Sequence, residues 1–305
     1  MSEKPYLTVY GHVTVDQIVR VQRFPVLNET VDVMEKKTTL GGTGSNIAIA
    51  AVTLGVPTAL AAYVGQDFQP KFESMIRDSG VIMDDFVAVE DYETSSCTIV
   101  NTDAMEQKVV FYQGPQGSGS VIGKDLTGCA RKSEKVHFCT GEADWYLDMM
   151  DALRGGPAVA MDPAQETYRF WNADRLRRAV GGCSALFCNE FEAKVIEERL
   201  GLGSVTELDL PLVVRTEGSK GSVARIDGEV VRIPMVEGRA VVDPTGCGDS
   251  MRAGFYAGQY RGYSVKDSLI IGASVASFVI EKMGAITNLP DWDQALERAG
   301  PYLEG

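Results

Sequence analysis

The spacing of apolar and polar residues changes along the chain, with a break near residue 120. Before the break, apolar and polar residues alternate in segments 13–21, 30–34, 96–101 and 108–112. Such alternation predicts strands with one face in solvent. These strands interrupt the α/β pattern of the chain on either side of them. We therefore expect two pieces of chain, about 12–38 and 92–115, to meet in space as a small β-sheet lid.

After residue 120, apolar strands alternate with amphipathic helices along the chain. This rhythm predicts βαβ units and a mainly parallel sheet with helices on both faces. The expected strands are 6–10, 59–64, 135–139, 158–161, 185–188 and 212–215, with a late hairpin at 222–226 and 230–233. The expected helices are 43–54, 68–78, 145–153, 171–180, 190–200, 246–260, 265–282 and 291–299. We expect one α/β domain, residues 1–305, with the lid inserted into it.

Composition and charge narrow the class of protein. Apolar residues make up 45% and charged residues 23%, as in ordinary globular proteins. The net charge of −13 disfavours nucleic acid as the main partner, because phosphate backbones are repelled. The first residues show no secretion signal, and the longest apolar run, 269–280, is shorter than the ~20 residues that span a bilayer. We expect a cytoplasmic protein that does not contact membranes.

The cysteines and histidines of this chain give little support for a metal site or for a catalytic triad. The six cysteines form no CxxC pair and are expected to be small buried apolar residues. The two histidines leave few ligands for a zinc site and few bases for a Ser-His-Asp triad.

The segment 242–255 (VDPTGCGDSMRAGF) carries the strongest chemical signal. A strand is expected to end near Val242 and a helix to begin near Gly246. Gly246 and Gly248 let the backbone approach a ligand, and the helix start attracts anions. A carboxylate at Asp249 would repel a phosphate, so it is either a general base for a substrate hydroxyl or a helix cap.

A second glycine-rich segment, 40–54 (LGGTGSNIAIAAVTL), opens another expected helix. It is neither a Walker loop nor a GxGxxG motif. Gly41 and Gly42 would give a backbone surface for a polyhydroxylated ligand, and Asn46 would hydrogen-bond to it. Glycines and a polar residue at a helix start also serve packing alone, and the segment by itself does not decide between the two.

Together the two segments resemble the signatures of a known family. GGTGSNIAIAAVTLG at 41–55 and DPTGCGDSMRAGF at 243–255 are similar to the N-terminal and C-terminal signatures of the ribokinase family, the phosphofructokinase-B (PfkB) type carbohydrate and nucleoside kinases. The resemblance covers essentially the whole chain. It implies a three-layer α/β/α domain with a β-sheet lid, and transfer of a phosphoryl group from ATP to a hydroxymethyl group.

The resemblance also implies roles for single residues. Asp249 would be the base, and the amides around Gly246, Cys247 and Gly248 would stabilise charge on the transferred group. Asp16, in GHVTVD at 11–16, would contact sugar hydroxyls. The residues implied in binding ATP are Asn189, Thr216, Gly218, Gly221, Gly272, Ala273 and Ala276. Asn189 and Glu192 would order Mg²⁺ through water, and Asp243 would belong to a site for a monovalent cation such as K⁺.

Cys247 departs from the family pattern, which often has a smaller residue between the two glycines. Since a helix N-terminus stabilises a thiolate, we expect the pKa of Cys247 to be lowered and thiol reagents to inhibit in part.

The substrate is less closely defined. A nucleoside, a sugar such as ribose, or a sugar phosphate fits the family, and a silent nucleoside-binding protein on the same fold is a distant alternative. GHVTVD looks more like archaeal-type nucleoside kinases, and Phe111 and Tyr112 could stack on a base. We therefore favour a nucleoside. The exposed edges of the lid strands also suggest a homodimer formed through the lid.

Overall fold

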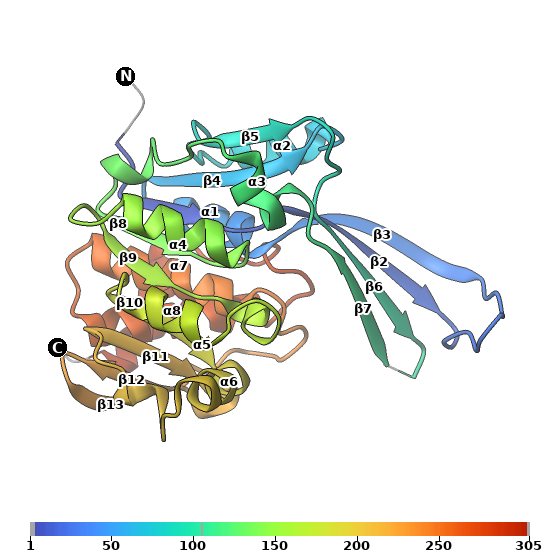
Figure 1. Ribbon diagram of the computed structural model, residues 1–305. Coiled ribbons are helices and arrows are strands. Elements are labelled where there is room, and N and C mark those ends of the chain that lie inside the picture. Colours follow the sequence, from blue (N-terminus) through green and yellow to red (C-terminus); the bar gives the residue numbers. More distant parts are fainter. Residues whose placement is uncertain (1–3, 105, 304–305) are drawn as a thin grey trace.

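The computed structural model describes residues 4–104 and 106–303, and in this part of the chain a nine-stranded sheet forms the centre of the molecule (Figure 1). The strand order is β13-β12-β11-β10-β9-β8-β1-β4-β5. The strands are β1 (Leu7–Tyr10), β4 (Thr58–Gly65), β5 (Phe86–Val89), β8 (Lys135–Phe138), β9 (Ala158–Met161), β10 (Ala185–Asn189), β11 (Leu212–Thr216), β12 (Ser222–Ile226) and β13 (Glu229–Ile233).

Seven neighbouring strands of this sheet, from β11 to β5, run parallel, and the hairpin β12–β13 adds two antiparallel strands at one edge. The central strands are almost continuously apolar and buried, as expected when helices cover both faces. The hairpin turns at Asp227 and Gly228, both with positive φ, which suits their short side chains.

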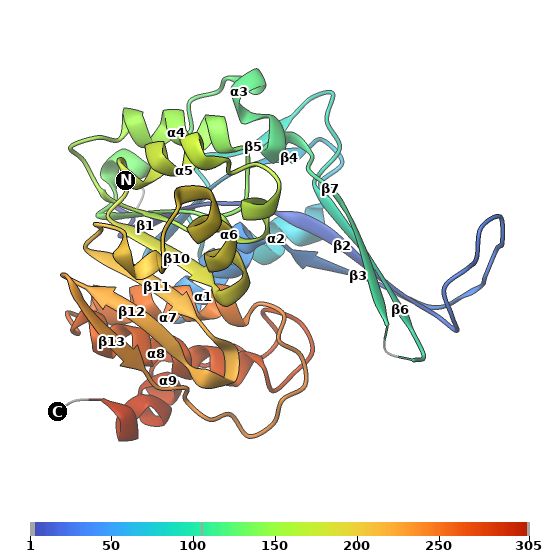
Figure 2. The same ribbon diagram turned by 60° about the horizontal axis from the view of Figure 1, so that its bottom comes forward.

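Helices form a layer on each face of the sheet (Figures 1 and 2). One buried core joins the sheet to α1 (Thr43–Thr53), α7 (Cys247–Tyr260), α8 (Val265–Val279) and α9 (Trp292–Ala299). A second core joins the other face to α4 (Ala143–Ala152), α5 (Ala173–Val180) and α6 (Glu190–Leu200). Two further helices, α2 (Pro70–Asp78) and α3 (Gly119–Ile122), lie near β4 and β5. The predicted α/β class and three-layer arrangement are confirmed.

A separate four-stranded sheet projects from one end of the body (Figure 1). Its order is β3-β2-β6-β7, from strands β2 (Thr14–Val21), β3 (Val33–Gly41), β6 (Ser96–Thr102) and β7 (Gln107–Tyr112). The alternating segments near both expected lid pieces therefore pair with each other. Strand β3 starts later than the expected 30–34 and runs on to Gly41, which joins this sheet directly to α1.

Two expectations about elements are wrong. No strand ends near Val242, because residues 234–245 are irregular and α7 begins at Cys247 after a turn. Strand β5 was not expected, since Phe86–Val89 is short and only partly buried at the sheet edge. Within residues 4–104 and 106–303, no helix combines the length and apolar character needed to cross a membrane.

Candidate active site

The site forms where two helix starts meet at the carboxyl ends of the parallel strands. The first turns of α1 and α7 carry Asn46 and Asp249, which are 203 residues apart in sequence. The Asn46 Nδ2 donates a hydrogen bond of 2.7 Å to the Asp249 Oδ2. The fold therefore brings the two glycine-rich segments into direct contact.

The carboxylate of Asp249 lies in surroundings that resist its ionisation. Burial raises the pKa of Asp249 to about 7, with a smaller contribution from the charge of Asp162, while the hydrogen bond from Asn46 and the charge of Arg252 lower it. Among the described residues, the first-turn amides of α7 donate no hydrogen bond to the Asp249 carboxylate, so Asp249 does not cap this helix. Its pKa near neutrality suits a group that accepts and releases a proton.

The helix α7 begins after a turn at Gly246 and has no side-chain cap. Gly246 has φ of 77°, and a Cβ there would lie 2.3 Å from the Ala285 Cβ, so a side chain is excluded. Cys247 and Gly248 follow in the first turn and both line the large cavity described below. The Cys247 amide donates to the Pro244 carbonyl oxygen at 3.2 Å, and the absence of a side-chain cap leaves the Gly246 and Gly248 amides available to an anion.

The predicted lowering of the Cys247 pKa is wrong. Burial, together with the charges of Asp243 and Asp249, raises the pKa of the Cys247 thiol to about 11. The helix start is close by, but its effect is smaller than that of desolvation and two nearby carboxylates.

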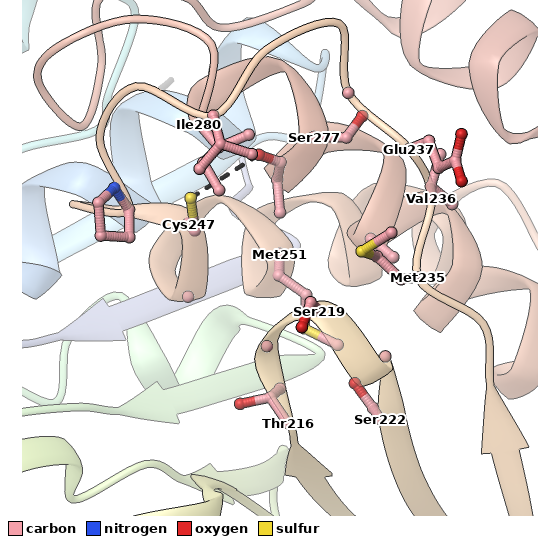
Figure 3. A pocket seen from close by; sticks show the side chains of 18 of the residues that line it. Thr216, Ser219, Ser222, Met235, Val236, Glu237, Cys247, Met251, Ser277 and Ile280 are labelled. Atoms are coloured by element: carbon pink, nitrogen blue, oxygen red, sulfur yellow. Dashed lines mark hydrogen bonds between the residues drawn. The ribbon is translucent and has the colours of Figure 1, made fainter.

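A cavity of about 550 Å³ lies between α7, α8 and the strand ends β11–β13 (Figure 3). Thr216 and Ser219 lie on one side of it, and Cys247 and Ser277 lie across from them on the helices. The predicted residues that line this cavity are Thr216, Gly218, Gly221, Cys247, Gly248, Ala273 and Ala276. Apolar side chains complete the wall, namely Met235, Val236, Val241, Met251 and Ile280.

Gly272 is predicted to face the nucleotide, but it lies outside this lining. It is buried in the contact between α7 and α8, where a Cβ would lie 2.5 Å from the Met251 carbonyl oxygen. The small residue at this position serves close helix packing. The helical spacing of the segment explains why it was grouped with Ala273 and Ala276, which do line the cavity.

Asn189 and Glu192 form a reciprocal cap at the start of α6. The Asn189 Oδ1 accepts from the Phe191 and Glu192 amides, and the Glu192 Oε2 accepts from the Asn189 amide at 2.8 Å. The Asn189 Nδ2 also donates to the Glu192 Oε1 at 2.7 Å. Burial, and next the charge of Asp162, raise the pKa of Glu192 to about 7. The geometry thus shows the capping role directly.

Asp243 ties the loop before α7 to the loop after α8. Its Oδ1 accepts from the Thr245 amide at 2.9 Å and its Oδ2 from the Gly284 amide at 2.8 Å. Burial alone would raise the pKa of Asp243, but these hydrogen bonds outweigh it and hold the pKa below its usual value. The carboxylate is ionised and structural, with a second lone pair left on each oxygen.

Asp16 lies on the second sheet, above the first turn of α1. The Thr14 Oγ1 donates to the Asp16 Oδ1 at 2.6 Å, and burial raises the pKa of Asp16. A Cβ on Gly41 would lie 2.1 Å from the Asp16 Oδ2. Gly42 has φ of 99°, and a Cβ there would meet the His12 carbonyl oxygen at 2.3 Å. Gly42 is therefore required by backbone contacts, and a side chain at Gly41 would displace the Asp16 carboxylate.

The two aromatic candidates on β7 lie on opposite faces of the second sheet. Asp16 pairs with Cys97 across β2 and β6, and Cys97 pairs with Phe111 across β6 and β7, so these three side chains share one face. Tyr112 follows Phe111 and points to the other face. Phe111 can line a pocket with Asp16, whereas the prediction that Tyr112 lines the same pocket is wrong.

Sequence reasoning missed a buried ion pair below the first turn of α7. The Arg252 Nε donates to the Asp162 Oδ2 at 2.7 Å, and both side chains are more than nine-tenths buried. Two sequence signals could have found it. Asp162 directly follows an apolar strand, and Arg252 comes three residues after Asp249 on the same helix.

Comparison with known proteins now identifies the family. The family model for pfkB family carbohydrate kinases matches residues 4–292. The chain belongs to the pfkB family of carbohydrate kinases. The predicted membership and enzyme class, an ATP-dependent kinase, are thereby confirmed.

Relatives within this family match almost from end to end. A nucleoside kinase of Methanothermobacter thermautotrophicus is 30% identical, over 98% of this chain and 96% of the relative. A nucleoside kinase of Methanocaldococcus jannaschii is 31% identical, over 96% of each chain. The crystal structure of a nucleoside kinase from M. jannaschii, an archaeal member of the ribokinase family, superposes with a TM-score of 0.90 at 28% identity, over 98% of this chain and 100% of that one.

Proposed function

We propose that this kinase moves the γ-phosphoryl group of ATP to the hydroxymethyl group of a nucleoside, with Asp249 as the general base. The observation that carries the proposal is the Asp249 carboxylate at the open start of α7, held by Asn46 and next to a cavity of about 550 Å³. The nucleoside is supported by the relatives with about 30% identity over nearly the full chain, which are nucleoside kinases.

The cavity suits the nucleotide. Its walls are mainly apolar, with Ala273 and Ala276 leaving space for a flat base, and the Thr216 hydroxyl lies at its edge. The open amides of Gly246 and Gly248 would hold the transferred phosphoryl group, and the Cys247 amide, which donates to the Pro244 carbonyl oxygen, would join them if this bond opens. Asn189 and Glu192, at the end of the adjacent strand β10, would face the phosphates from the other side.

Magnesium would be held chiefly by the phosphates of ATP. Within the described residues, no group of three or more His, Cys, Asp or Glu side chains is placed to hold a metal ion. The oxygens of Glu192 keep lone pairs beyond their hydrogen bonds, which fits a carboxylate that binds a water of Mg²⁺. When bound, the ion would neutralise charge on the phosphates. We also assign Asp243 to a monovalent-cation site, since its oxygens retain lone pairs at the same loop.

Asp249 would take the proton of the acceptor hydroxyl while that oxygen bonds to the γ-phosphorus and ADP leaves. Asp16 would bind two hydroxyls of the ribose, and Asn46 would hold the Asp249 carboxylate in place. Phe111, on the face of Asp16, would contact the base. The second sheet would close over the substrate as a lid and exclude water.

The test is release of ADP in the presence of ATP and Mg²⁺ with a panel of nucleosides, ribose, fructose and fructose phosphates. We expect turnover on nucleosides, and a loss of kcat of about 100-fold or more in Asp249→Asn, the usual range for a positioned base. Asp174→Asn is the matched control, because Asp174 is exposed on α5 and pairs with Arg177 on the same helix. An Asp249→Asn variant within threefold of wild type refutes the base, and nucleoside binding without ADP release would indicate a silent binding protein.

We further propose that two chains associate through the second sheet. Its outer strands, β3 and β7, have unpaired edges, and Val109 and Val110 on β7 are 53% and 69% exposed. Light scattering at micromolar concentration is expected to give twice the chain mass, and a monomer would contradict it.

A further inference from the structure

If the large cavity binds ATP, positive charge is needed to balance the phosphates. The residues assigned so far do not supply a full positive charge. ATP carries several negative charges. The amides at the start of α7 provide only partial positive charges to balance them. Of the described residues that line the cavity, Arg252 is basic and Glu237 is acidic, and the others are neutral. The search for a phosphate partner within this lining therefore leads to one guanidinium.

Arg252 is fixed in place, but its hydrogen-bonding capacity is not used up. A guanidinium has five N–H groups. The Arg252 Nε donates to the Asp162 Oδ2 at 2.7 Å, and its Nη1 donates to the Gly248 carbonyl oxygen at 3.2 Å. Among residues 4–104 and 106–303, Nη2 finds no hydrogen-bond acceptor. The side chain is only 4% exposed and lines the cavity, so a ligand or a water molecule that enters the cavity can accept from these donors.

Arg252 is the basic group among several acidic side chains. The carboxylates of Asp162, Glu192 and Asp249 all act electrostatically on this guanidinium. They come from the ends of β9 and β10 and from α7, the elements that surround the expected position of the transferred phosphoryl group. These acidic groups would repel a phosphate tail that enters this region, and Arg252 is the permanent cation that offsets part of this repulsion.

We propose that Arg252 is a further substrate-binding residue, which donates hydrogen bonds from its free N–H groups to the terminal phosphates of the nucleotide. Asp162 would hold the guanidinium in position, and Gly248 would link it to the turn that carries the open amides. This inference rests on the proposed function, because it requires that the large cavity bind the nucleotide.

The test compares the binding of adenosine, AMP, ADP and a non-hydrolysable ATP analogue, measured by calorimetry without Mg²⁺ and without acceptor. In Arg252→Met we expect affinity for ADP and the ATP analogue to fall about tenfold or more, since hydrogen bonds to charged groups contribute strongly. Affinity for adenosine should stay within twofold. Lys220→Gln is the control, because Lys220 adjoins the cavity without lining it.

A second variant separates binding from a structural effect. Arg252→Met alone leaves the Asp162 carboxylate buried without its partner, whereas Asp162→Asn combined with Arg252→Met removes both charges. If Arg252 binds phosphate, the double variant keeps the loss for ADP and regains thermal stability. Equal losses for adenosine and ADP, or recovery of ADP affinity in the double variant, would overturn the inference. A wild-type protein that binds neither ADP nor the ATP analogue would overturn the proposed function itself.

Discussion

The hydrogen bond from Asn46 to Asp249 should control the pH at which the enzyme becomes active. Asn46 donates to the Asp249 carboxylate at 2.7 Å and lowers its pKa, while burial raises that pKa to about 7. Removing the donor in Asn46→Ala leaves burial unopposed at this oxygen, so the pKa rises further. A hydrogen bond to a charged group is worth about 1.5–3 kcal/mol, and 1.36 kcal/mol corresponds to one pKa unit. The lower end of this range gives a shift of about one unit.

The assay is the pH dependence of kcat/KM for the nucleoside between pH 5.5 and 9.5. A base must be ionised to work, so activity rises with pH through the pKa of Asp249 and then levels off. At pH 7 the ionised fraction would fall from about one half to about one tenth in the variant. Loss of a substrate contact would lower the whole curve without moving it. Thr53→Ala, at the far end of α1, is the control. An Asn46→Ala curve with its midpoint unmoved refutes the reasoning.

Three further predictions follow from the geometry. Phe111→Ala should raise KM for the nucleoside at least about fivefold, because aromatic contacts with a base are strong. Tyr112→Ala, on the opposite face of the sheet, should leave this KM unchanged. Equal effects of the two variants on KM in steady-state kinetics would contradict the prediction. Gly41→Ala should raise the same KM by about tenfold or more, since its Cβ has no room, whereas Gly300→Ala, with open space around it, should leave KM unchanged. Cys247 should react slowly with iodoacetamide at pH 7.5 and faster as the pH approaches its pKa of about 11, as followed by mass spectrometry.

Much of the fold could be predicted because its elements differ in spacing and burial. The strand Ala158–Met161 and the helix Glu190–Leu200 match their predicted bounds, since apolar strands and amphipathic helices leave distinct patterns. The approach to α7 was misread, because residues 234–245 carry apolar side chains that line the cavity and not a strand. Local patterns cannot separate these two uses of an apolar segment.

The residues of the site could be predicted where their role depends on the conformation of their own segment. They could not be predicted where the role depends on contacts between distant segments. Gly41, Gly42 and Gly246 are required by close approaches that a glycine-rich motif already suggests. The face on which Tyr112 lies depends on the register of three strands, and the packing of Gly272 depends on how α7 meets α8. Such relations join distant parts of the chain, so one segment read alone does not contain them.

The pKa of Cys247 is raised, although its place at a helix start predicted a lowered pKa. The sizes of the two opposing effects explain this result. A helix N-terminus stabilises a nearby negative charge by about 0.3–1 kcal/mol, which is less than one pKa unit. Burial can shift a pKa by up to about 3–5 units in the other direction. At the start of α7 burial prevails for both acidic groups, so the pKa of Cys247 rises to about 11 and that of Asp249 to about 7. The same burial that raises the pKa of the thiol also raises the pKa of the carboxylate to a value suited to proton transfer. A helix start therefore indicates a catalytic group only when the depth of the group is known as well.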